Sequence, residues 1–413
     1  MLKVRGFQIR IFILVIVVLA VIGTLVAVSA STNSSKGTSP TTTVVASTTN
    51  TTTQTTNAKA PLLPQPPANA PSYLQPGSNP SALPSDLLIA ENYGSQLLIV
   101  NPQGQIVWQF PPAGSSFQLK YPDDAFFSSD GRYIIVTQED YQKISLISIA
   151  QDKVVWTYGT PDTPGSGPEQ LYNPDDALIL PNGNILSADI KNCSIVILSK
   201  TQQYPLERIG ILTHNCYHNP PYRFGSPNGV FPLNNGNYLV TEINGDWVDE
   251  MTSSGKILWS THPPGVYYPS DTNEVAPNLY ITADYSDPGQ IVEFNKQGEL
   301  IWRYGPRSGP GALNTPSLCE VIPTNGYVIC NDDSNNRVIV INPQTNQIVW
   351  QYGVTSVAST APGYLNHPDG LDLAPPYSLL SRHFSTMGNF PQPCSPSNPL
   401  GTCTYNQQSV AGG

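Results

Sequence analysis

The chain has 413 residues, of which only 12% are charged, and its formal net charge is −10. A surface so poor in charge and acidic in balance argues against a nucleic-acid-binding protein, which requires clustered Lys and Arg. The length allows one large core, and radially repeated folds of this size form a single domain.

The N-terminus has the pattern of an exported protein. Lys3, Arg5 and Arg10 precede an uncharged apolar run over residues 11–28, and these 18 residues reach the lower limit for spanning a bilayer. Flanking basic residues favour a cytoplasmic N-terminus. We predict that residues 1–30 form a transmembrane signal anchor, which would leave the remainder extracellular or periplasmic. The alternative is a secreted protein whose signal peptide is cleaved.

A segment of low sequence complexity follows this apolar run. Residues 31–56 are dominated by Ser and Thr, and residues 61–84 are rich in Pro, Ala, Ser and Asn. Such compositions bury too little apolar surface to offset the entropy of ordering the chain. We therefore predict that residues 31–84 form a disordered stalk.

The remainder repeats one pattern six times. Each unit begins with a proline that is followed by small or acidic residues, at spacings of 42 to 53 residues. These prolines are Pro122, Pro174, Pro227, Pro269, Pro316 and Pro368. A second series is in phase with them and consists of Trp108, Trp156, Trp259, Trp302 and Trp350. We expect these tryptophans to pack between neighbouring units.

Each unit has the pattern of four short strands. In the unit of Pro269 the strands are expected at residues 268–275, 279–284, 289–295 and 298–305, with Gly, Asn and Pro in the last two turns. Short strands repeated at this period predict an all-β fold, a β-propeller with one four-stranded sheet per blade.

The sixth unit is divided between the two ends of the repeat region. Residues 366–373 supply a first strand, and the pattern then stops, whereas residues 86–110 supply only a second, third and fourth strand. Joining the two segments completes a blade and removes the free sheet edges. We predict a six-bladed propeller over residues 85–376, followed by a loosely packed tail over residues 377–413.

Six cysteines in an exported chain are expected to form disulfides. Cys319 and Cys330 flank a turn symmetrically, so a tight hairpin would place them opposite each other. Cys394 and Cys403 bracket a loop in the tail, and Cys193 with Cys216 then remain as the third pair. The alternative for Cys319 and Cys330 is that they are small buried residues without a bond.

The repeats resemble two known families. The segments NGNYLVTE, PNLYITAD and NNRVIVINPQTNQIVWQYG, together with the strand-opening prolines, are similar to the NHL and PQQ-like propeller repeats. This resemblance implies a fold and no particular activity. PQQ itself is not expected as a cofactor, because the quinoproteins of that type have eight blades and an adjacent cysteine pair, and no two cysteines are adjacent here.

One carboxylate or amide ends the second strand of every unit. Because all these ends lie at the same face, we expect a ring of oxygen ligands there, which would suit Ca²⁺. The candidate metal ligands are Glu91, Asp189, Glu242, Asp284 and Asp332, with Gln138 in the remaining unit. Further acidic residues are expected near them, namely Asp123, Asp124, Asp175, Asp176, Asp271 and Asp369. The alternatives are that these side chains satisfy local backbone amides, or that they attract a basic partner.

The same face carries the longest loops, which on a rigid scaffold usually bind ligands. We therefore expect a binding or interaction module that meets an envelope or extracellular protein, or a glycan. Residues 226–259 also resemble a repeat of arylsulfotransferases, six-bladed propellers with a nucleophilic His. That resemblance, or one to lactonase-type propellers, implies the alternative of an enzyme with His367 in the central mouth. The residues that would assist it are His214, His218, Arg223 and Arg307.

Overall fold

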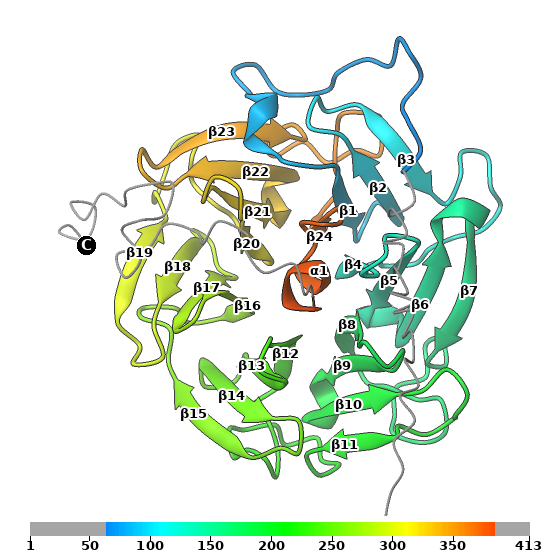
Figure 1. Cartoon of the computed structure of the whole chain (residues 1–413), viewed down its shortest axis with the longest axis vertical. Coiled ribbons are helices and arrows are strands. Elements are labelled where there is room, and N and C mark those ends of the chain that lie inside the picture. Colours follow the sequence, from blue (N-terminus) through cyan, green and yellow to red (C-terminus); the bar gives the residue numbers. More distant parts are fainter. Residues whose placement is uncertain (1–62, 385–413) are drawn as a thin grey trace, which may run out of the picture. The chain divides into compact units, whose positions relative to one another are not determined.

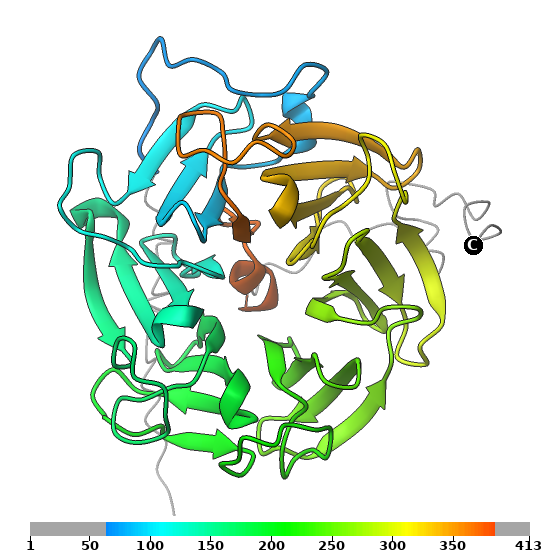
Figure 2. The ribbon, with the colours of Figure 1, turned by 180° about the vertical axis from the view of Figure 1, so that it is seen from behind.

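The computed structural model describes residues 63–384. Within this range, 24 strands form six antiparallel sheets of four strands each, arranged as a ring (Figure 1). The prediction of a six-bladed β-propeller is confirmed. The reverse face of the ring is seen in Figure 2.

Three blades come from the first half of the ring. The first contains β24 (Pro368–Leu373), β1 (Leu87–Glu91), β2 (Gln96–Val100) and β3 (Ile106–Phe110). The second contains β4 (Ala125–Phe127), β5 (Tyr133–Gln138), β6 (Lys143–Ser148) and β7 (Lys153–Tyr158). The third contains β8 (Pro174–Ile179), β9 (Ile185–Asp189), β10 (Ser194–Leu198) and β11 (Glu207–Ile209).

The other three blades continue around the ring. The fourth contains β12 (Pro227–Pro232), β13 (Asn237–Glu242), β14 (Trp247–Thr252) and β15 (Ile257–Thr261). The fifth contains β16 (Pro269–Ala276), β17 (Leu279–Asp284), β18 (Gln290–Phe294) and β19 (Leu300–Tyr304). The sixth contains β20 (Cys319–Val321), β21 (Val328–Asp332), β22 (Arg337–Asn342) and β23 (Gln347–Tyr352).

Short helices lie outside the sheets. Five 3-10 helices are described: η1 (Pro80–Ala82), η2 (Glu139–Tyr141), η3 (Ile149–Gln151), η4 (Ile190–Asn192) and η5 (Asp333–Asn335). The α-helix α1 (Leu379–Phe384) follows the last strand.

The ring is closed by strands from the two ends of the described chain. β24 pairs antiparallel with β1, and the partners include Leu371 with Ile89 and Leu373 with Leu87. This pairing was predicted from the missing strand at each end. It covers the edge of β1 that a flat sheet would leave without hydrogen-bond partners.

The two faces of each inner strand pack against different neighbours. Leu87 and Ile89 of β1 belong to one apolar cluster, whereas Leu88 and Ala90 belong to another. An inner strand of a propeller is covered on both faces, which explains why LLIAE is apolar almost throughout instead of alternating.

Three of the repeated tryptophans connect one blade to the next, as expected. The indole N–H of Trp108 donates to Asp152 at 2.7 Å, and that of Trp302 donates to Asn346 at 3.1 Å. Trp350 donates to the carbonyl of Pro102 at 3.0 Å and so spans the closure of the ring. Trp156 and Trp259 are only half-buried.

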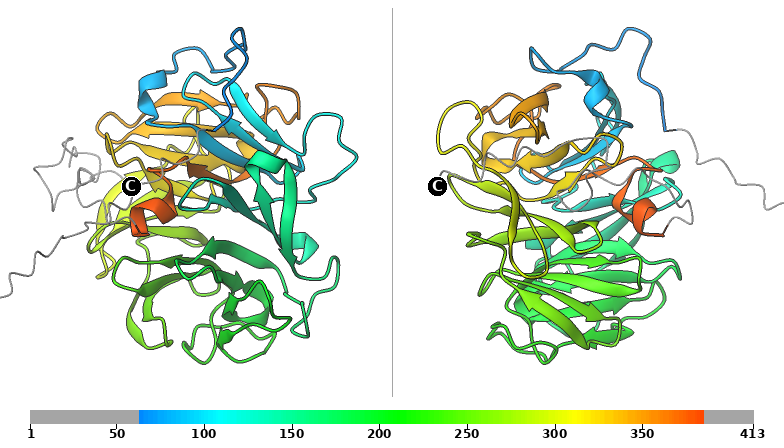
Figure 3. Two further views of the ribbon diagram at one scale, coloured as in Figure 1. Left: turned by 45° about the vertical axis from the view of Figure 1, so that its right-hand side comes forward. Right: turned by 60° about the vertical axis from the view of Figure 1, so that its left-hand side comes forward.

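The helix α1 lies at the centre of the ring (Figure 1). β24 begins at the face where the first strands start and ends at the opposite face, where α1 follows it (Figure 3). Leu379 and Leu380 are buried in the same cluster as Phe126 and Phe231. Asp372 accepts the backbone N–H of Leu379 at 3.0 Å. The first part of the predicted loose tail is therefore docked, and residues 385–413 lie outside the described residues.

Residues 63–84 do not behave as a disordered stalk. The backbone N–H groups of Gln75 and Asn79 donate to carbonyls of Gln351 and Val349 on β23, at 3.1 and 2.7 Å. Ala82 and Leu83 are buried in the core. Composition misled this prediction because the outer edge of a blade offers unpaired backbone acceptors to any neighbouring segment. Residues 31–62 of the predicted stalk lie outside the described residues.

Two of the three expected disulfides are present. Cys319 and Cys330 face each other across β20 and β21 and are bonded, and Cys193 is bonded to Cys216. The second bond fastens the loop before β12 to the end of η4. Cys394 and Cys403 lie outside the described residues.

The predicted single-pass membrane localisation is not supported and is corrected here. Within residues 63–384, no helix is long and apolar enough to cross a membrane. The segment predicted as the anchor, residues 11–28, lies outside the described residues, as does the N-terminal helix expected there.

Candidate metal centre

The carboxylates that end the second strands are engaged within their own blades. Each accepts a backbone N–H from the segment that leads into the first strand of the same blade. Glu91 accepts Asn366 at 2.9 Å, Asp189 accepts Tyr172 at 2.8 Å, Glu242 accepts Gly225 at 2.5 Å, Asp284 accepts Tyr268 at 3.0 Å, and Asp332 accepts Asn314 at 2.7 Å. We call these five residues, together with Gln138, the entry clamps.

Gln138 also binds the segment that leads into the first strand of its blade, but as a hydrogen-bond donor instead of an acceptor. Its side-chain amide donates to the carbonyl of Lys120 at 2.7 Å, where the other clamps accept an N–H. Two clamps also pair with a cation: Asp189 with Arg208 and Asp332 with Arg337, each at 2.7 Å. The five carboxylate clamps were the predicted metal ligands. In the described chain, no group of closely spaced metal-ligating atoms contains two of them.

A sharp turn follows the clamped segment in five of the six blades. The residue before the proline has a left-handed backbone, with φ between 47° and 57° in Tyr121, Asn173, Ser226, Thr315 and His367. This region is unfavourable for residues other than glycine. The two residues after each proline lie in the innermost strand of the blade or directly before it, which brings them close to the axis of the ring (Figure 1).

These positions gather carboxylates near the axis of the ring. A small cavity of about 110 Å³ opens there, and we call it the central mouth. It is lined by Asp123, Asp124, Glu139, Asp175, Asn228, Tyr268, Ser270, Asp271, Tyr285 and Asp369. Asp176 lies directly beside it, since its carboxylate groups with those of Asp124 and Asp271.

Two triads of oxygen atoms form in the central mouth and directly beside it. Candidate ligand atoms of Asp123, Asp124 and Asp175 lie within 4.8 Å of one another, and so do those of Asp124, Asp176 and Asp271. Asp124 belongs to both triads. At the rim, Asp333, His367 and Asp369 form a third group at the same spacing.

The inner carboxylates lack enough hydrogen-bond donors. One oxygen each of Asp124, Asp176 and Asp271 is buried without a hydrogen-bond partner. Asp123 receives only the amide of Asn92, at 3.1 Å, and Asp176 receives the backbone N–H of Val230, at 2.8 Å. None of the ion pairs found among residues 63–384 involves these aspartates.

Burial and mutual repulsion dominate the electrostatics of the mouth. Burial, followed by the charge of Asp271 and Asp176, raises the pKa of Asp124 well above its usual value. Burial, followed by the charge of Asp124, does the same to the pKa of Asp175. Burial also raises the pKa of Glu139 to about 7. Such a cluster must be protonated in part or neutralised by a cation.

The cluster fits a hard divalent cation. Its donors are carboxylate oxygens, several of them free to bind, and Ca²⁺ takes six to eight oxygen ligands in flexible geometry. The sequence predicted two sets of acidic residues at this face. The carboxylate clamps, predicted as the ligands, are spread over their own blades, whereas the aspartates that were expected to lie near them are the ones that the fold brings together.

Glu139 and Asp333 were missed by the sequence reasoning. Both follow directly after a clamp residue, Gln138 and Asp332 respectively. Asn92 and Tyr285 occupy the same position in their blades, after Glu91 and Asp284. The sequence signal for these residues was therefore their position directly after a clamp. Successive side chains along a strand point to opposite sides, so the residue after the clamp points away from the clamp contact and toward the axis.

The residues expected for an enzyme are not gathered. His367 stacks on Tyr93 at 4.4 Å, and its Nε2 lies 3.4 Å from the hydroxyl of Tyr285. No hydrogen bond of the described residues joins His367 to another His or to an Arg side chain; its surroundings are aromatic and acidic.

Within residues 63–384, no hydrogen bond, ion pair or ring contact joins the other four residues to His367. His214 contacts the carbonyl of Lys191, and Arg223 lies over the ring of Tyr217 at 3.7 Å. Arg307 is exposed on the loop after β19. His218 contacts Glu242 at 3.2 Å, away from the central mouth.

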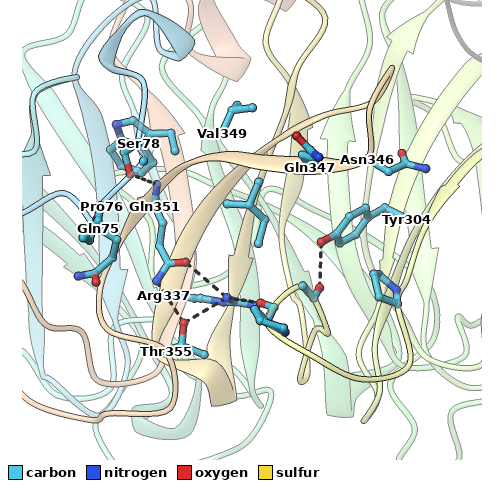
Figure 4. Close-up of a pocket in the computed structure, with 16 residues that line it drawn as sticks. Gln75, Pro76, Ser78, Tyr304, Arg337, Asn346, Gln347, Val349, Gln351 and Thr355 are labelled. Carbon is cyan, nitrogen blue, oxygen red and sulfur yellow. Dashed lines mark hydrogen bonds between the residues drawn. The ribbon is translucent and has the colours of Figure 1, made fainter.

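A larger cavity, of about 570 Å³, lies between the sixth blade and residues 75–78 (Figure 4). Its charged residue, Arg337, is already occupied. The guanidinium donates to Asp332, Gln351 and Thr355 and to two backbone carbonyls, so it is an element of the clamp. We therefore place the candidate site in the central mouth.

Residues 210–363 match the family model described as outer membrane protein assembly factor BamB, a PQQ-like repeat family. A search of the curated proteins returned no match. Among solved structures, a protein of unknown function from Bacteroides caccae is 17% identical over 70% of this chain and 98% of its own, with a TM-score of 0.49. A streptogramin B lyase is 16% identical over 75% and 92% of the two chains, with a TM-score of 0.46. Virginiamycin B lyase from Staphylococcus aureus is 19% identical over 55% and 69%, with a TM-score of 0.40. Similarity this low carries no argument about activity.

Proposed function

We propose, from the premise that this chain is a β-propeller of PQQ-like repeats, that it is a binding module whose central mouth holds a Ca²⁺ ion. The observation that carries this proposal is the set of buried, unpartnered oxygens of Asp124, Asp176 and Asp271, which take part in none of the ion pairs found among residues 63–384. A bound divalent cation would supply the missing charge and satisfy these oxygens together.

The role as a binding module is supported by the surface around the mouth. Tyr93, Tyr222 and Tyr267 expose 61%, 66% and 79% of their surface, and all three lie on loops at the end where the first strands begin. Exposed tyrosines provide large contact areas at a low cost in side-chain entropy. We propose that this face binds an extracellular protein or a glycan, with the cation holding the first strands in register beneath it.

Calcium titration of the full-length protein after chelator treatment tests this proposal. Wild-type protein should bind Ca²⁺ in isothermal titration calorimetry, and its melting temperature should rise with Ca²⁺ concentration, since ligand at 100 times Kd adds about 2.7 kcal/mol of stability. Asp124→Asn, which alters both triads, should lower the affinity by more than about tenfold, because affinity follows ligand charge.

The control is Asp162→Asn, a change of the same chemistry at an exposed turn. It should bind Ca²⁺ as wild type does. In chelator, Asp124→Asn should melt at a higher temperature than wild type because one repelling charge is gone, whereas a purely structural role would lower the melting temperature. Absence of calcium binding by the wild-type protein, or equal affinity of Asp124→Asn and wild type, would overturn the proposal.

A further inference from the structure

A second group of potential ligands lies in the fourth blade, outside the central mouth. Glu242 ends β13, Asp249 lies in the adjacent β14, and His218 comes from the loop before β12. Glu242 pairs with Trp247 and Val240 pairs with Asp249. Glu242 and Asp249 are therefore diagonal neighbours on one face of the sheet.

The loop reaches this face because it is fastened at two points. Cys216 is bonded to Cys193, and its carbonyl accepts the amide of Asn244 at 3.0 Å. His218, two residues further on, is held over the two carboxylates. Its Nδ1 lies 3.2 Å from Glu242 Oε2 and 3.8 Å from Asp249 Oδ2.

These distances suit a small metal ion. In a tetrahedral site with bonds of ~2.0–2.1 Å, as for Zn²⁺, neighbouring ligand atoms lie ~3.3 Å apart. The three candidate atoms all lie within 4.8 Å of one another. His218 keeps 22% of its side-chain surface exposed, so solvent water can reach the remaining coordination position.

Asp249 provides an independent indication of a ligand. The residue is fully buried, yet neither of its carboxylate oxygens has a hydrogen-bond partner. Glu242 Oε1 is likewise buried and unpartnered. Glu242 Oε2 accepts the N–H of Gly225 and contacts His218 Nδ1, but these contacts leave Asp249 without a hydrogen-bond donor. A buried carboxylate without a partner costs several kcal/mol, and both carboxylates face the ring nitrogen of His218.

The surroundings hold the three side chains in place. Trp247 stacks on the His218 ring at 4.1 Å, and the opposing His262 ring lies 3.7 Å from the same indole. The N–H of Gly225 donates to Glu242. A Cβ atom at residue 225 would lie 2.3 Å from the carbonyl of Asn244, so only glycine allows this approach. Fixed outer contacts of this kind orient metal ligands in proteins.

We infer that His218, Glu242 and Asp249 form a second cation site, which takes a divalent transition-metal ion of the Zn²⁺ type. One imidazole nitrogen with two carboxylate oxygens favours such an ion over Ca²⁺ or Mg²⁺, which prefer oxygen ligands alone. The bound ion cross-links the loop of His218 to β13 and β14 and thereby fixes part of the face that surrounds the mouth.

Zinc binding by the full-length protein tests this site. The protein is kept oxidised, so that Cys193 and Cys216 provide no thiols, and Ca²⁺ is present in excess. Equilibrium dialysis against Zn²⁺ followed by elemental analysis should find tightly bound zinc, of which one equivalent per chain depends on His218. Co²⁺ in its place should give the intense visible absorption of a site with few ligands.

His218→Ala and Asp249→Asn should both lose this zinc and the Co²⁺ absorption. His262→Ala is the matched control, since His262 contacts the same indole but its ring nitrogen contacts the carbonyl of Asp246 at 2.9 Å instead of the carboxylates, and it should retain both signals. His218→Ala decides the question even where Asp249→Asn folds poorly, because His218 is partly exposed on a loop.

The second site is independent of the proposed calcium site. Asp124→Asn should therefore keep the zinc while it loses affinity for calcium. No stoichiometric zinc in the wild-type protein, or the same zinc affinity in His218→Ala and wild type, would overturn the inference and leave the calcium proposal untouched.

Discussion

The five carboxylate clamps and the aspartates of the central mouth are the same chemical groups placed one strand apart. A clamp such as Asp284 accepts two backbone N–H groups, those of Tyr267 and Tyr268. Asp271, one strand further in, has a buried oxygen with no donor at all. The comparison shows that the nearby backbone N–H groups determine what a carboxylate does in this repeat. The outer ones hold the blade together, and the inner ones are left free for a ligand.

The largest expected effect is the change in unfolding free energy when the aspartates of the central mouth and the adjacent Asp176 lose their protons. The pKa values of Asp123, Asp124, Asp175, Asp176 and Asp271 are raised in the folded state. Above about pH 4 the folded chain therefore binds more protons than the unfolded chain, and stability falls as the pH rises. The slope is up to about 1.4 kcal/mol per pH unit for each such group.

Denaturant unfolding in the presence of a chelator, from pH 5 to pH 8, measures this decrease in unfolding free energy. Saturating Ca²⁺ should flatten the curve, because the cation replaces the protons as the source of compensating charge. A chelated protein whose stability is constant or rises from pH 5 to pH 8 would contradict the assignment of the inner aspartates as uncompensated.

Removing a clamp that pairs with a buried guanidinium should lower the unfolding free energy by a similarly large amount. Asp332→Ala removes the acceptor of the Asn314 N–H and leaves the Arg337 guanidinium buried without its carboxylate. Removing one partner of a buried ion pair typically lowers the unfolding free energy by ~3–5 kcal/mol. Urea denaturation measures this change. Under conditions in which the variant is fully folded, its affinity for calcium should equal that of the wild-type protein. A loss below 1 kcal/mol would show that the clamp contributes little.

The inverted clamp gives a smaller and more specific effect. Gln138→Glu places a carboxylate against the carbonyl of Lys120, two acceptors with no proton between them. The unfolding free energy should fall by ~1–3 kcal/mol, as for other buried groups that lose their partner, and less below pH 5, where the new carboxyl is protonated. A pH-independent loss would mean that the change acts through packing.

The smallest effect is expected from the reverse exchange at an ordinary clamp. In Glu91→Gln the new amide oxygen still accepts the N–H of Asn366. The other carboxylate oxygen, which accepts the side-chain amide of Gln96 at 2.7 Å, becomes an NH2 group, so this one hydrogen bond is lost. The unfolding free energy should therefore fall by about 1 kcal/mol. Together with Gln138→Glu, this variant separates the polarity of the hydrogen bond from the charge of the clamp.

The fold could be predicted closely because it follows from repetition. The period of the prolines and tryptophans defined the number of blades, and β17 has the bounds expected from the pattern of residues 279–284. The closure through β24 followed from the strand missing at each end. The docking of residues 63–84 could not be predicted, because a segment without apolar periodicity gives no sign of which exposed strand edge it will meet.

The site was harder to predict because distance from the axis is not visible in a strand pattern. Asp189 and Asp175 lie in adjacent strands and both are acidic, yet only Asp175 belongs to the central mouth. The clamp geometry depends on backbone amides, which every sequence possesses. The group of His218, Glu242 and Asp249 depends on where a disulfide leads a loop, and spacing along the chain gives no indication of this.

The pairing of β24 with β1 also has a consequence for biosynthesis. During translation, residues 87–91 leave the ribosome long before residues 368–373 have been made, so the inner edge of the first sheet must wait for a partner almost three hundred residues away. Until then the nascent chain presents an open edge that can recruit other strands. Truncated products that end before residue 368 should therefore aggregate or require a chaperone, whereas a circular permutant that encodes β24 directly ahead of β1 should mature without that delay.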